Sequence, residues 1–266
     1  MPFGLTNARA TFQGLMNTIF AHLIRKCVLV FVDDILIYSQ TLEDHVSHLR
    51  EVFQLLQQHE LYVKASKCSF AKSHLEYLGH IIGVAGVSTD LGKVKAVQDW
   101  LVPKNLRQLR GFLGLVGYYR KFIQGYGLMT NPLTKFLKKD VKYVWSPLAQ
   151  EAFDSVKQAL TQAPVLRLPD FTQQFVVQTD ACDKGIGAVL LHQGHPISFL
   201  SKALGPRAHA LSTYEKECLA ILLAIQRWQL YLQHVEVIIQ TYHRSLVYLG
   251  EHQLTTSIQH KAFVML

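Results

Sequence analysis

Two adjacent aspartates, Asp33 and Asp34, lie between two uninterrupted apolar runs, residues 28–32 and 35–38. Short apolar, β-branched runs around a polar break are typical of two strands joined by a tight turn. Carboxylates beside a core are costly unless something compensates their charge, and a divalent cation would do so. Asp-Asp also matches poorly the Asn-Gly and Asp-Gly pairs that hairpin turns favour. These residues alone support a metal site and a solvent-exposed turn about equally.

The composition is that of an ordinary folded protein. The chain has 266 residues, 49% of them hydrophobic and 17% charged, which leaves room for two domains. Its apolar stretches are much shorter than the roughly 20 residues of a membrane span, and the N-terminus lacks a signal-peptide pattern. We therefore expect an intracellular protein, cytoplasmic or nuclear, that is neither secreted nor membrane-bound. The four scattered cysteines predict neither a disulfide framework nor a zinc module, but reduced and mostly buried thiols.

Positive charge is concentrated in one segment. Residues 91–142 contain eleven Lys or Arg against two Asp, a charge of +9, so the rest of the chain carries −1 of the total +8. Dense positive charge releases counterions from a phosphate backbone and favours nucleic acid. A solvated helical face is the alternative, and charge alone does not separate the two.

Hydrophobic periodicity changes twice along the chain. It predicts a helix over residues 10–26, a hairpin over 27–38 with the acids at its tip, a helix beginning at Thr41 with Asp44 as its capping partner, and a strand over 75–82. The second helix is expected to bury a stripe formed by Val46, Leu49, Phe53 and Leu56.

Short helices follow: one before Pro103, one beginning at Asn105 and one opened by Ser146-Pro147. The Asn105 helix is expected to present one apolar face, made of Leu109, Leu113, Val116 and Tyr119. Strands are then predicted over residues 175–181, 186–192 and 196–201, a long helix over 212–233, a strand over 235–241 and a final helical stretch. The sequence thus predicts a mixed α/β (α+β) protein with parts at 1–83, 84–169 and 170–266.

Ordered motifs across nearly the whole chain resemble the Pol polyprotein of gypsy-type LTR retrotransposons. Residues 1–8 (MPFGLTNA) with 11–13 (TFQ), and then 31–34 (FVDD), are similar to the polymerase motifs of these reverse transcriptases. Further matches are residues 77–80 (YLGH), 118–123 (YYRKFI), 163–166 (APVL), 179–182 (TDAC) and 211–217 (LSTYEKE). The resemblance implies a partial reverse-transcriptase palm, a helical and basic thumb or connection, and a ribonuclease H-like mixed sheet with helices.

The resemblance assigns roles to residues of the first part. Asp33 and Asp34 are expected to hold Mg²⁺, or Mn²⁺, for a two-metal nucleotidyl transfer. Phe3 and Gly4 correspond to positions that line the nucleotide pocket, and Leu78, Gly79 and His80 correspond to the hairpin that grips the primer. The implied partners are an RNA–DNA hybrid or single-stranded nucleic acid, with deoxynucleotides as substrates in the intact family.

In the last part, Asp180 at the end of an apolar strand and Glu217 on a helix are the expected carboxylates of a ribonuclease H metal site. Glu215 fits a helix cap after Ser212. Read in isolation, Gly185-Ile186-Gly187 suggests a nucleotide-binding loop, but no third glycine opens a helix, so a turn between strands is expected. For each acid taken alone, a solvated surface position is the ordinary alternative.

The sequence departs from the family where further ligands are expected. Tyr242 stands where the family has an aspartate, and tyrosine is a weak magnesium ligand at neutral pH. One polymerase aspartate is expected upstream of Met1, and the last ribonuclease H aspartate beyond Leu266. Because hard cations depend steeply on carboxylate number, we expect weak metal binding and an inactive chain.

Two other functions remain open from the sequence. One is a non-catalytic module that binds nucleic acid through the basic segment, and the other is a decayed retrotransposon relic. The sequence does not reveal the host, the oligomeric state, residual activity, whether integrase or protease segments belong to the same element, or whether this is a truncated gene model.

Overall fold

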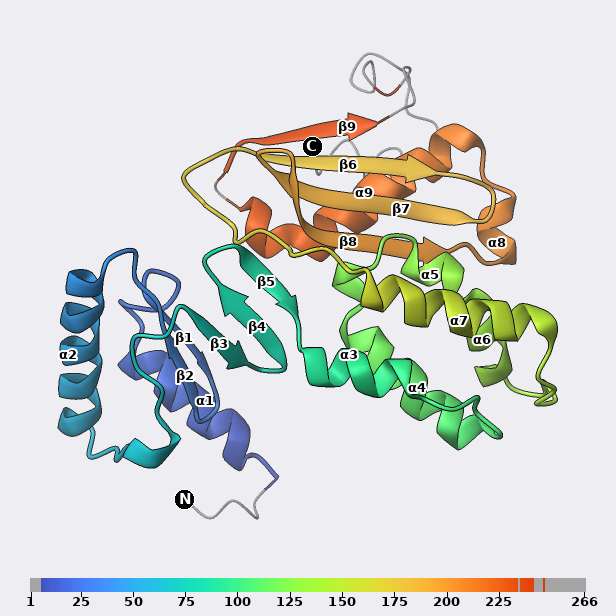
Figure 1. Ribbon diagram of the computed structural model, residues 1–266. Helices are drawn as coiled ribbons and strands as arrows, with labels where there is room; N and C mark the ends of the chain where they lie inside the picture. The colour runs from blue at the N-terminus through green and yellow to red at the C-terminus, as the bar shows by residue number, and fades with distance from the viewer. Residues whose placement is uncertain (1–5, 234, 242–245, 247–266) are drawn as a thin grey trace. The chain divides into compact units, whose positions relative to one another are not determined.

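The computed structural model describes residues 6–233, 235–241 and 246. Two compact units divide the chain between Leu78 and Gly79, and each is described here by itself. Both combine helices with strands (Figure 1), so the predicted mixed α/β class is confirmed. No helix in the described ranges is both long and apolar enough to cross a membrane. Cys27 and Cys218 are buried as expected, whereas Cys182 is exposed.

The N-terminal unit is built on a β-hairpin. Strands β1 (Val28–Phe31) and β2 (Asp34–Ile37) pair antiparallel with Phe31 opposite Asp34, so the predicted hairpin with the acids at its tip is confirmed. Helix α1 (Ala8–Ile19) precedes it, and α2 (Leu42–Gln58), the 3-10 turn η1 (Ala65–Lys67) and β3 (His74–Tyr77) follow. A buried cluster joins these elements: Met16, Ile19, Phe20, Leu23, Cys27, Val28, Val52 and Leu56.

Helix α2 begins as predicted but buries only part of the predicted stripe. The Thr41 hydroxyl caps it by accepting a hydrogen bond from the Asp44 N–H at 3.1 Å. Val52 and Leu56 are the residues that reach the core, while Val46 and Phe53 remain 47% and 41% exposed. The predicted stripe was therefore wrong at these two positions. Periodicity shows that one face is apolar, but the packing of α1 and β1 selects which part of it is covered.

The C-terminal unit starts with the hairpin β4 (His80–Gly83) and β5 (Gly86–Thr89). The single strand predicted over residues 75–82 was wrong, because Leu78 and Gly79 have φ angles of 49° and 69° and separate β3 from β4. Positive φ at consecutive positions turns the chain and ends a strand.

Six short helices and turns follow, and one long helix closes this part. They are α3 (Leu91–Gln98), α4 (Leu106–Tyr118), η2 (Arg120–Phe122), α5 (Tyr126–Met129), α6 (Asn131–Thr134), η3 (Lys135–Leu137) and α7 (Pro147–Thr161). The side chains of Asn105 and Ser146 cap α4 and α7 as their sequence positions predicted.

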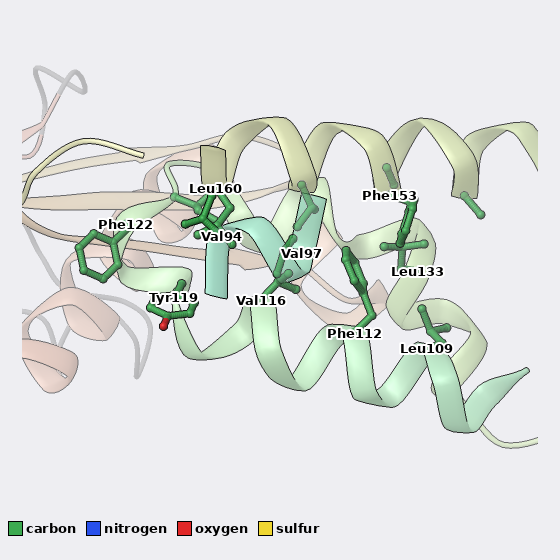
Figure 2. Close-up of a cluster of buried hydrophobic side chains, with 14 of the residues drawn as sticks. Val94, Val97, Leu109, Phe112, Val116, Tyr119, Phe122, Leu133, Phe153 and Leu160 are labelled. Atoms are coloured by element: carbon green, nitrogen blue, oxygen red, sulfur yellow. The ribbon is translucent and has the colours of Figure 1, made fainter. Parts of the chain in front are cut away.

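A buried cluster of α3, α4 and α7 side chains forms the core of this helical part (Figure 2). The Phe112 and Phe153 ring centroids are 4.5 Å apart. Leu109, Val116 and Tyr119 are buried as predicted, whereas Leu113 is only half-buried and Phe112 takes the inner position. The apolar stripe of α4 is thus rotated slightly from the predicted one.

A four-stranded sheet completes the unit, in the order β8-β7-β6-β9 (Figure 1). Strands β6 (Phe175–Ala181), β7 (Gly185–His192) and β8 (His195–Ala203) are antiparallel, and β9 (Val237–Thr241) runs parallel to β6. A short helix, α8 (Pro206–His209), leads to α9 (Thr213–Leu232), which packs against β6 and β7. The helical stretch predicted after residue 241 lies outside the described residues.

The helical part and the sheet share a tight contact along β8. The Gly127 N–H donates a 2.6 Å hydrogen bond to Ser201 Oγ, and a Cβ atom at Gly127 would lie 2.7 Å from the Ser201 carbonyl oxygen. A Cβ at Gly185 would lie 2.6 Å from Leu128 Cδ2. Both glycines therefore allow an approach that any larger residue prevents. The boundary predicted at residue 170 falls inside this unit, and the three-part division stays a prediction.

Candidate functional site

The Asp33-Asp34 pair occupies the tip of the β1–β2 hairpin. Both aspartates are exposed, and Val32 before them has a φ of 53°. The Tyr77 hydroxyl donates a 3.3 Å hydrogen bond to the Asp34 carbonyl oxygen. Burial, and then the nearby Asp34 carboxylate, raise the pKa of Tyr77 to about 12, so this tyrosine remains a neutral donor.

A groove opens beside the two aspartates. Its volume is about 570 Å³, and it is lined by Asp33, Asp34 and residues of α1, α2 and the 61–77 segment. Apolar groups such as Phe53 and Phe70 form much of the wall, while Lys64 and Lys67 add positive charge. The groove can therefore offer carboxylate oxygens to a cation and ammonium groups to an anion.

The donors suit a hard divalent cation in chemistry but not in number. Carboxylate oxygens are the ligands that Mg²⁺ and Mn²⁺ prefer. Across the described part of the chain, however, no three or more His, Cys, Asp or Glu side chains gather into a group that could hold a metal ion. Phe3 and Gly4, predicted to line the nucleotide pocket, lie outside the described residues.

His80, from the predicted primer-gripping motif, is surrounded by aromatic rings. Its imidazole stacks on Tyr118 with centroids 5.1 Å apart and meets Tyr119 edge-on at 5.5 Å. Burial, and then Lys121, lower the pKa of His80 to about 4. The ring is therefore neutral at physiological pH and holds the start of β4 against the end of α4.

Asp180 and Glu217 belong to the same end of the four-stranded sheet. Asp180 is exposed near the end of β6, and its neighbour Thr179 lies opposite Thr241 on the parallel strand β9. The Thr241 hydroxyl donates a 3.3 Å hydrogen bond to a Glu217 carboxylate oxygen. Glu217 is only 3% exposed, so the carboxylate predicted from the sequence points inward from α9. Tyr242, expected to replace a ligand, lies outside the described residues.

Glu215 has the capping role that its position predicted. Its carboxylate accepts hydrogen bonds from the Ser212 N–H and hydroxyl, and its own N–H donates to Ser212 Oγ, which forms a capping box. Next to it, the buried Lys216 ammonium donates to Asp183 at 2.7 Å. The sequence did not predict this ion pair, because its partners are far apart in the chain and belong to different elements.

The exposed face of α4 is basic, and at Gly114 no side chain covers the helix backbone. Arg107 and Arg110 are exposed near its beginning, and Gly114 and Tyr118 continue the same face at helical spacing. A Cβ at Gly114 would meet no atom within 4 Å. Packing inside the described molecule therefore does not require this glycine, although a helix-interior glycine costs about 1 kcal/mol relative to alanine.

Two family models match this chain, one in its N-terminal and one in its C-terminal part. A family model described as reverse transcriptase (RNA-dependent DNA polymerase) matches residues 1–82, and one described as an RNase H-like domain found in reverse transcriptase matches residues 145–239.

Curated relatives cover nearly the whole chain. It is 42% identical over 250 residues to the retrovirus-related Pol polyprotein from transposon 297 of Drosophila melanogaster, across 94% of this chain and 24% of that protein. It is 36% identical over 254 residues to the transposon Tf2-3 polyprotein of Schizosaccharomyces pombe, across 93% of this chain and 19% of that protein. The chain thus spans a quarter or less of the length of these relatives.

Solved structures share the fold. A foamy viral protease-reverse transcriptase in complex with double-stranded DNA has a TM-score of 0.87 and 20% identity, over 99% of this chain and 48% of that one. The same kind of enzyme in complex with an RNA/DNA hybrid has a TM-score of 0.84 and 20% identity, over 99% of this chain and 37% of that one.

Proposed function

Because this chain belongs to the reverse transcriptase and RNase H-like segment of retrotransposon Pol polyproteins, we propose that it binds RNA–DNA hybrid and single-stranded nucleic acid through its basic helical part. In the intact polyprotein, of the gypsy type, this segment serves RNA-directed DNA synthesis and cleavage of the hybrid. By itself the chain binds without turnover.

The exposed face of α4 is the observation that carries the binding proposal. Its two guanidinium groups, Arg107 and Arg110, can donate to phosphate oxygens. Gly114 leaves the helix backbone open on the same face, which allows a sugar-phosphate backbone to approach closely. Tyr118, half-exposed and stacked on His80, offers a rigid aromatic edge at the far end. The charge of residues 91–142 reinforces this face.

The four carboxylates belong to the proposal as incomplete sets. Asp33 and Asp34 would hold Mg²⁺ or Mn²⁺ at the polymerase end, and Asp180 and Glu217 would hold it at the ribonuclease H-like end. Bound divalent ions would supply charge stabilisation for an attacking and a leaving oxygen. Each described set has two carboxylates, and Tyr242 replaces one expected ligand, so metal binding is weak.

Binding is tested by fluorescence anisotropy with a labelled RNA–DNA hybrid over a range of salt concentrations. Arg107→Gln with Arg110→Gln is expected to weaken affinity about tenfold or more and to reduce the salt slope by about two. Lys26→Gln with Arg50→Gln removes the same charge from exposed positions of the other unit. An equal loss in this control would show that net charge, and not the α4 face, determines binding.

Catalysis is tested separately with the purified chain. We expect no primer extension and no hybrid cleavage with Mg²⁺ or Mn²⁺, and Tyr242→Asp restores at most weak cleavage. Primer extension that Asp33→Asn abolishes, or robust ribonuclease H activity of the unmodified chain, would overturn the inactivity.

A non-catalytic binding module is the second candidate function, and the same α4 face favours it. Salt-dependent binding without metal-dependent turnover by the chain, and by the longer polyprotein that contains it, would select this alternative. A decayed relic is excluded when the protein is detected in its host.

A further inference from the structure

The turn that carries Asp33 and Asp34 contains an uncommon backbone conformation. Val32 has a φ of 53°, in the left-handed region. A β-branched side chain rarely adopts this region, because its Cβ substituents approach the backbone. Such conformations persist only where surrounding contacts fix them, and they cluster at functional sites. The contacts that fix Val32 are therefore informative about the aspartates beside it.

One side chain, Gln13 of α1, holds this turn from the helix side. Its Oε1 accepts a 2.6 Å hydrogen bond from the Val32 N–H, and its Nε2 donates to the Val30 carbonyl at 3.2 Å. The Asn17 carboxamide, one helical turn further on, accepts a 2.8 Å hydrogen bond from the same Nε2. The Gln13 amide thus satisfies two backbone groups of the hairpin, as a neighbouring strand would.

The opposite side of the turn is held by Tyr77 through the Asp34 carbonyl oxygen. Contacts from α1 and β3 therefore fix the backbone on both sides of Asp33, while both carboxylates remain exposed.

We propose that Gln13 is a positioning residue for the Asp33-Asp34 carboxylate pair. It stabilises the left-handed Val32 and so directs both carboxylates toward one cation. This inference rests on the proposed function of the pair, but the part that concerns the backbone does not depend on metal binding.

The Gln13 amide combines the acceptor and the donor that the two backbone groups require. Glutamate keeps the acceptor for the Val32 N–H and loses the donor to Val30. Methionine keeps the length and apolar stem and loses both. Substitution of Val32 by glycine removes the Cβ, so the left-handed conformation no longer needs outside support. These differences make a double-mutant cycle between positions 13 and 32 informative.

The full chain, labelled with ¹⁵N-valine and ¹⁵N-aspartate, is studied by NMR in its Gln13→Met, Gln13→Glu, Val32→Gly and Gln13→Met/Val32→Gly forms. Amide exchange of Val32 reports the hydrogen bond, and Mn²⁺-induced broadening of the Asp33 and Asp34 signals reports the carboxylate pair. Thr18→Ala is the matched control, because Thr18 is an exposed α1 residue whose hydroxyl donates to the Gly14 carbonyl of its own helix.

Gln13→Met is expected to speed exchange of the Val32 amide about tenfold, the value of one lost hydrogen bond. It should also weaken Mn²⁺ broadening at both aspartates, and weaken it much less in the Val32→Gly background. Gln13→Glu should retain the slow exchange of Val32. Thr18→Ala should match the parent chain in both measurements.

An unchanged Val32 exchange rate in a folded Gln13→Met chain overturns the proposal, as does an equal Mn²⁺ effect in both Val32 backgrounds. If Gln13→Met fails to fold, Gln13→Glu decides, because fast Val32 exchange in that folded variant contradicts the assigned acceptor. Absence of Mn²⁺ broadening in the parent chain would instead count against the proposed metal role, and the Val32 exchange rates would still decide the role of Gln13.

Discussion

The Tyr119 hydroxyl donates a 2.7 Å hydrogen bond to the Gly79 carbonyl oxygen. Tyr119 is 1% exposed at the end of α4, whereas Gly79 has a φ of 69° in the turn that precedes β4. A buried side chain of the helical core therefore fixes the backbone of the motif that resembles a primer-gripping hairpin. This hydrogen bond joins two residues that are 40 positions apart in the sequence.

Loss of this hydroxyl should loosen the turn without emptying the core. Tyr119→Phe keeps the ring and is expected to lower the free energy of unfolding by about 1 kcal/mol, because the Gly79 carbonyl loses its donor. Urea denaturation measures the change. Tyr231→Phe is the control, since the described residues supply no hydrogen bond for that hydroxyl. An equal loss in both variants would contradict a specific role for the Tyr119–Gly79 bond.

The lowered pKa of His80 predicts a dependence of stability on pH. The imidazole titrates at about 4 in the folded chain, below its ordinary value of 6.5, so the unfolded state binds more protons between these values. Neutral His80 therefore adds to the free energy of unfolding in full above pH 6.5, and this contribution is lost as the pH falls toward 4. His80→Phe should therefore lose less thermal stability than the parent chain over this range. If the melting temperatures of the two proteins fall by the same amount between pH 6.5 and 4, the lowered pKa of His80 is refuted.

Close packing at Gly127 predicts a large effect of one methyl group. Gly127→Ala places a Cβ against the Ser201 backbone and is expected to destabilise the C-terminal unit by about 2 kcal/mol. Gly187→Ala is the matched control, because a Cβ there meets no atom within 4 Å. Thermal unfolding of both variants provides the comparison. Similar melting temperatures would mean that β8 can move away from residue 127 without a loss of stability.

Gly114 allows stability and binding to be separated. Gly114→Ala improves helix propensity at an open position, so the free energy of unfolding should rise by about 0.5–1 kcal/mol. The added methyl group lies on the proposed nucleic-acid face, so affinity for the hybrid should fall while stability rises. Denaturation and anisotropy on one preparation measure both. A variant that is more stable and binds equally well would remove Gly114 from the interface.

The sequence predicted most helices and strands well, because caps and turns are determined by residues that lie close together in the chain. The Asn105 and Ser146 caps, the β1–β2 hairpin and the capping box of Ser212 and Glu215 follow from side chains that satisfy nearby backbone groups. Strand β6 has the predicted bounds, and its buried and less buried residues alternate from Phe175 to Asp180. Errors arose where tertiary packing decides, as at Phe53 and Phe112.

The candidate site shows the same limit. The roles of Asp33, Asp34, Asp180 and Glu217 come from motifs and stay predictions, and the structure adds where each of these side chains lies. The contacts of Gln13 with Val32, of Tyr119 with Gly79 and of Lys216 with Asp183 were missed, because the partners in each are distant in sequence. A long-range hydrogen bond leaves no periodic or compositional signal in a single sequence.

The contact of Gly127 with Ser201 also bears on how such polyproteins diverge. The family models cover residues 1–82 and 145–239, and Gly127 lies between them. Yet β8 is fitted to Gly127, and Leu128 is fitted to Gly185. A recombination event that replaced the ribonuclease H-like segment from residue 145 onward would keep this fit only if the new segment supplied both a hydroxyl at position 201 and a glycine at position 185. The two segments are therefore expected to be exchanged between elements as one inherited block.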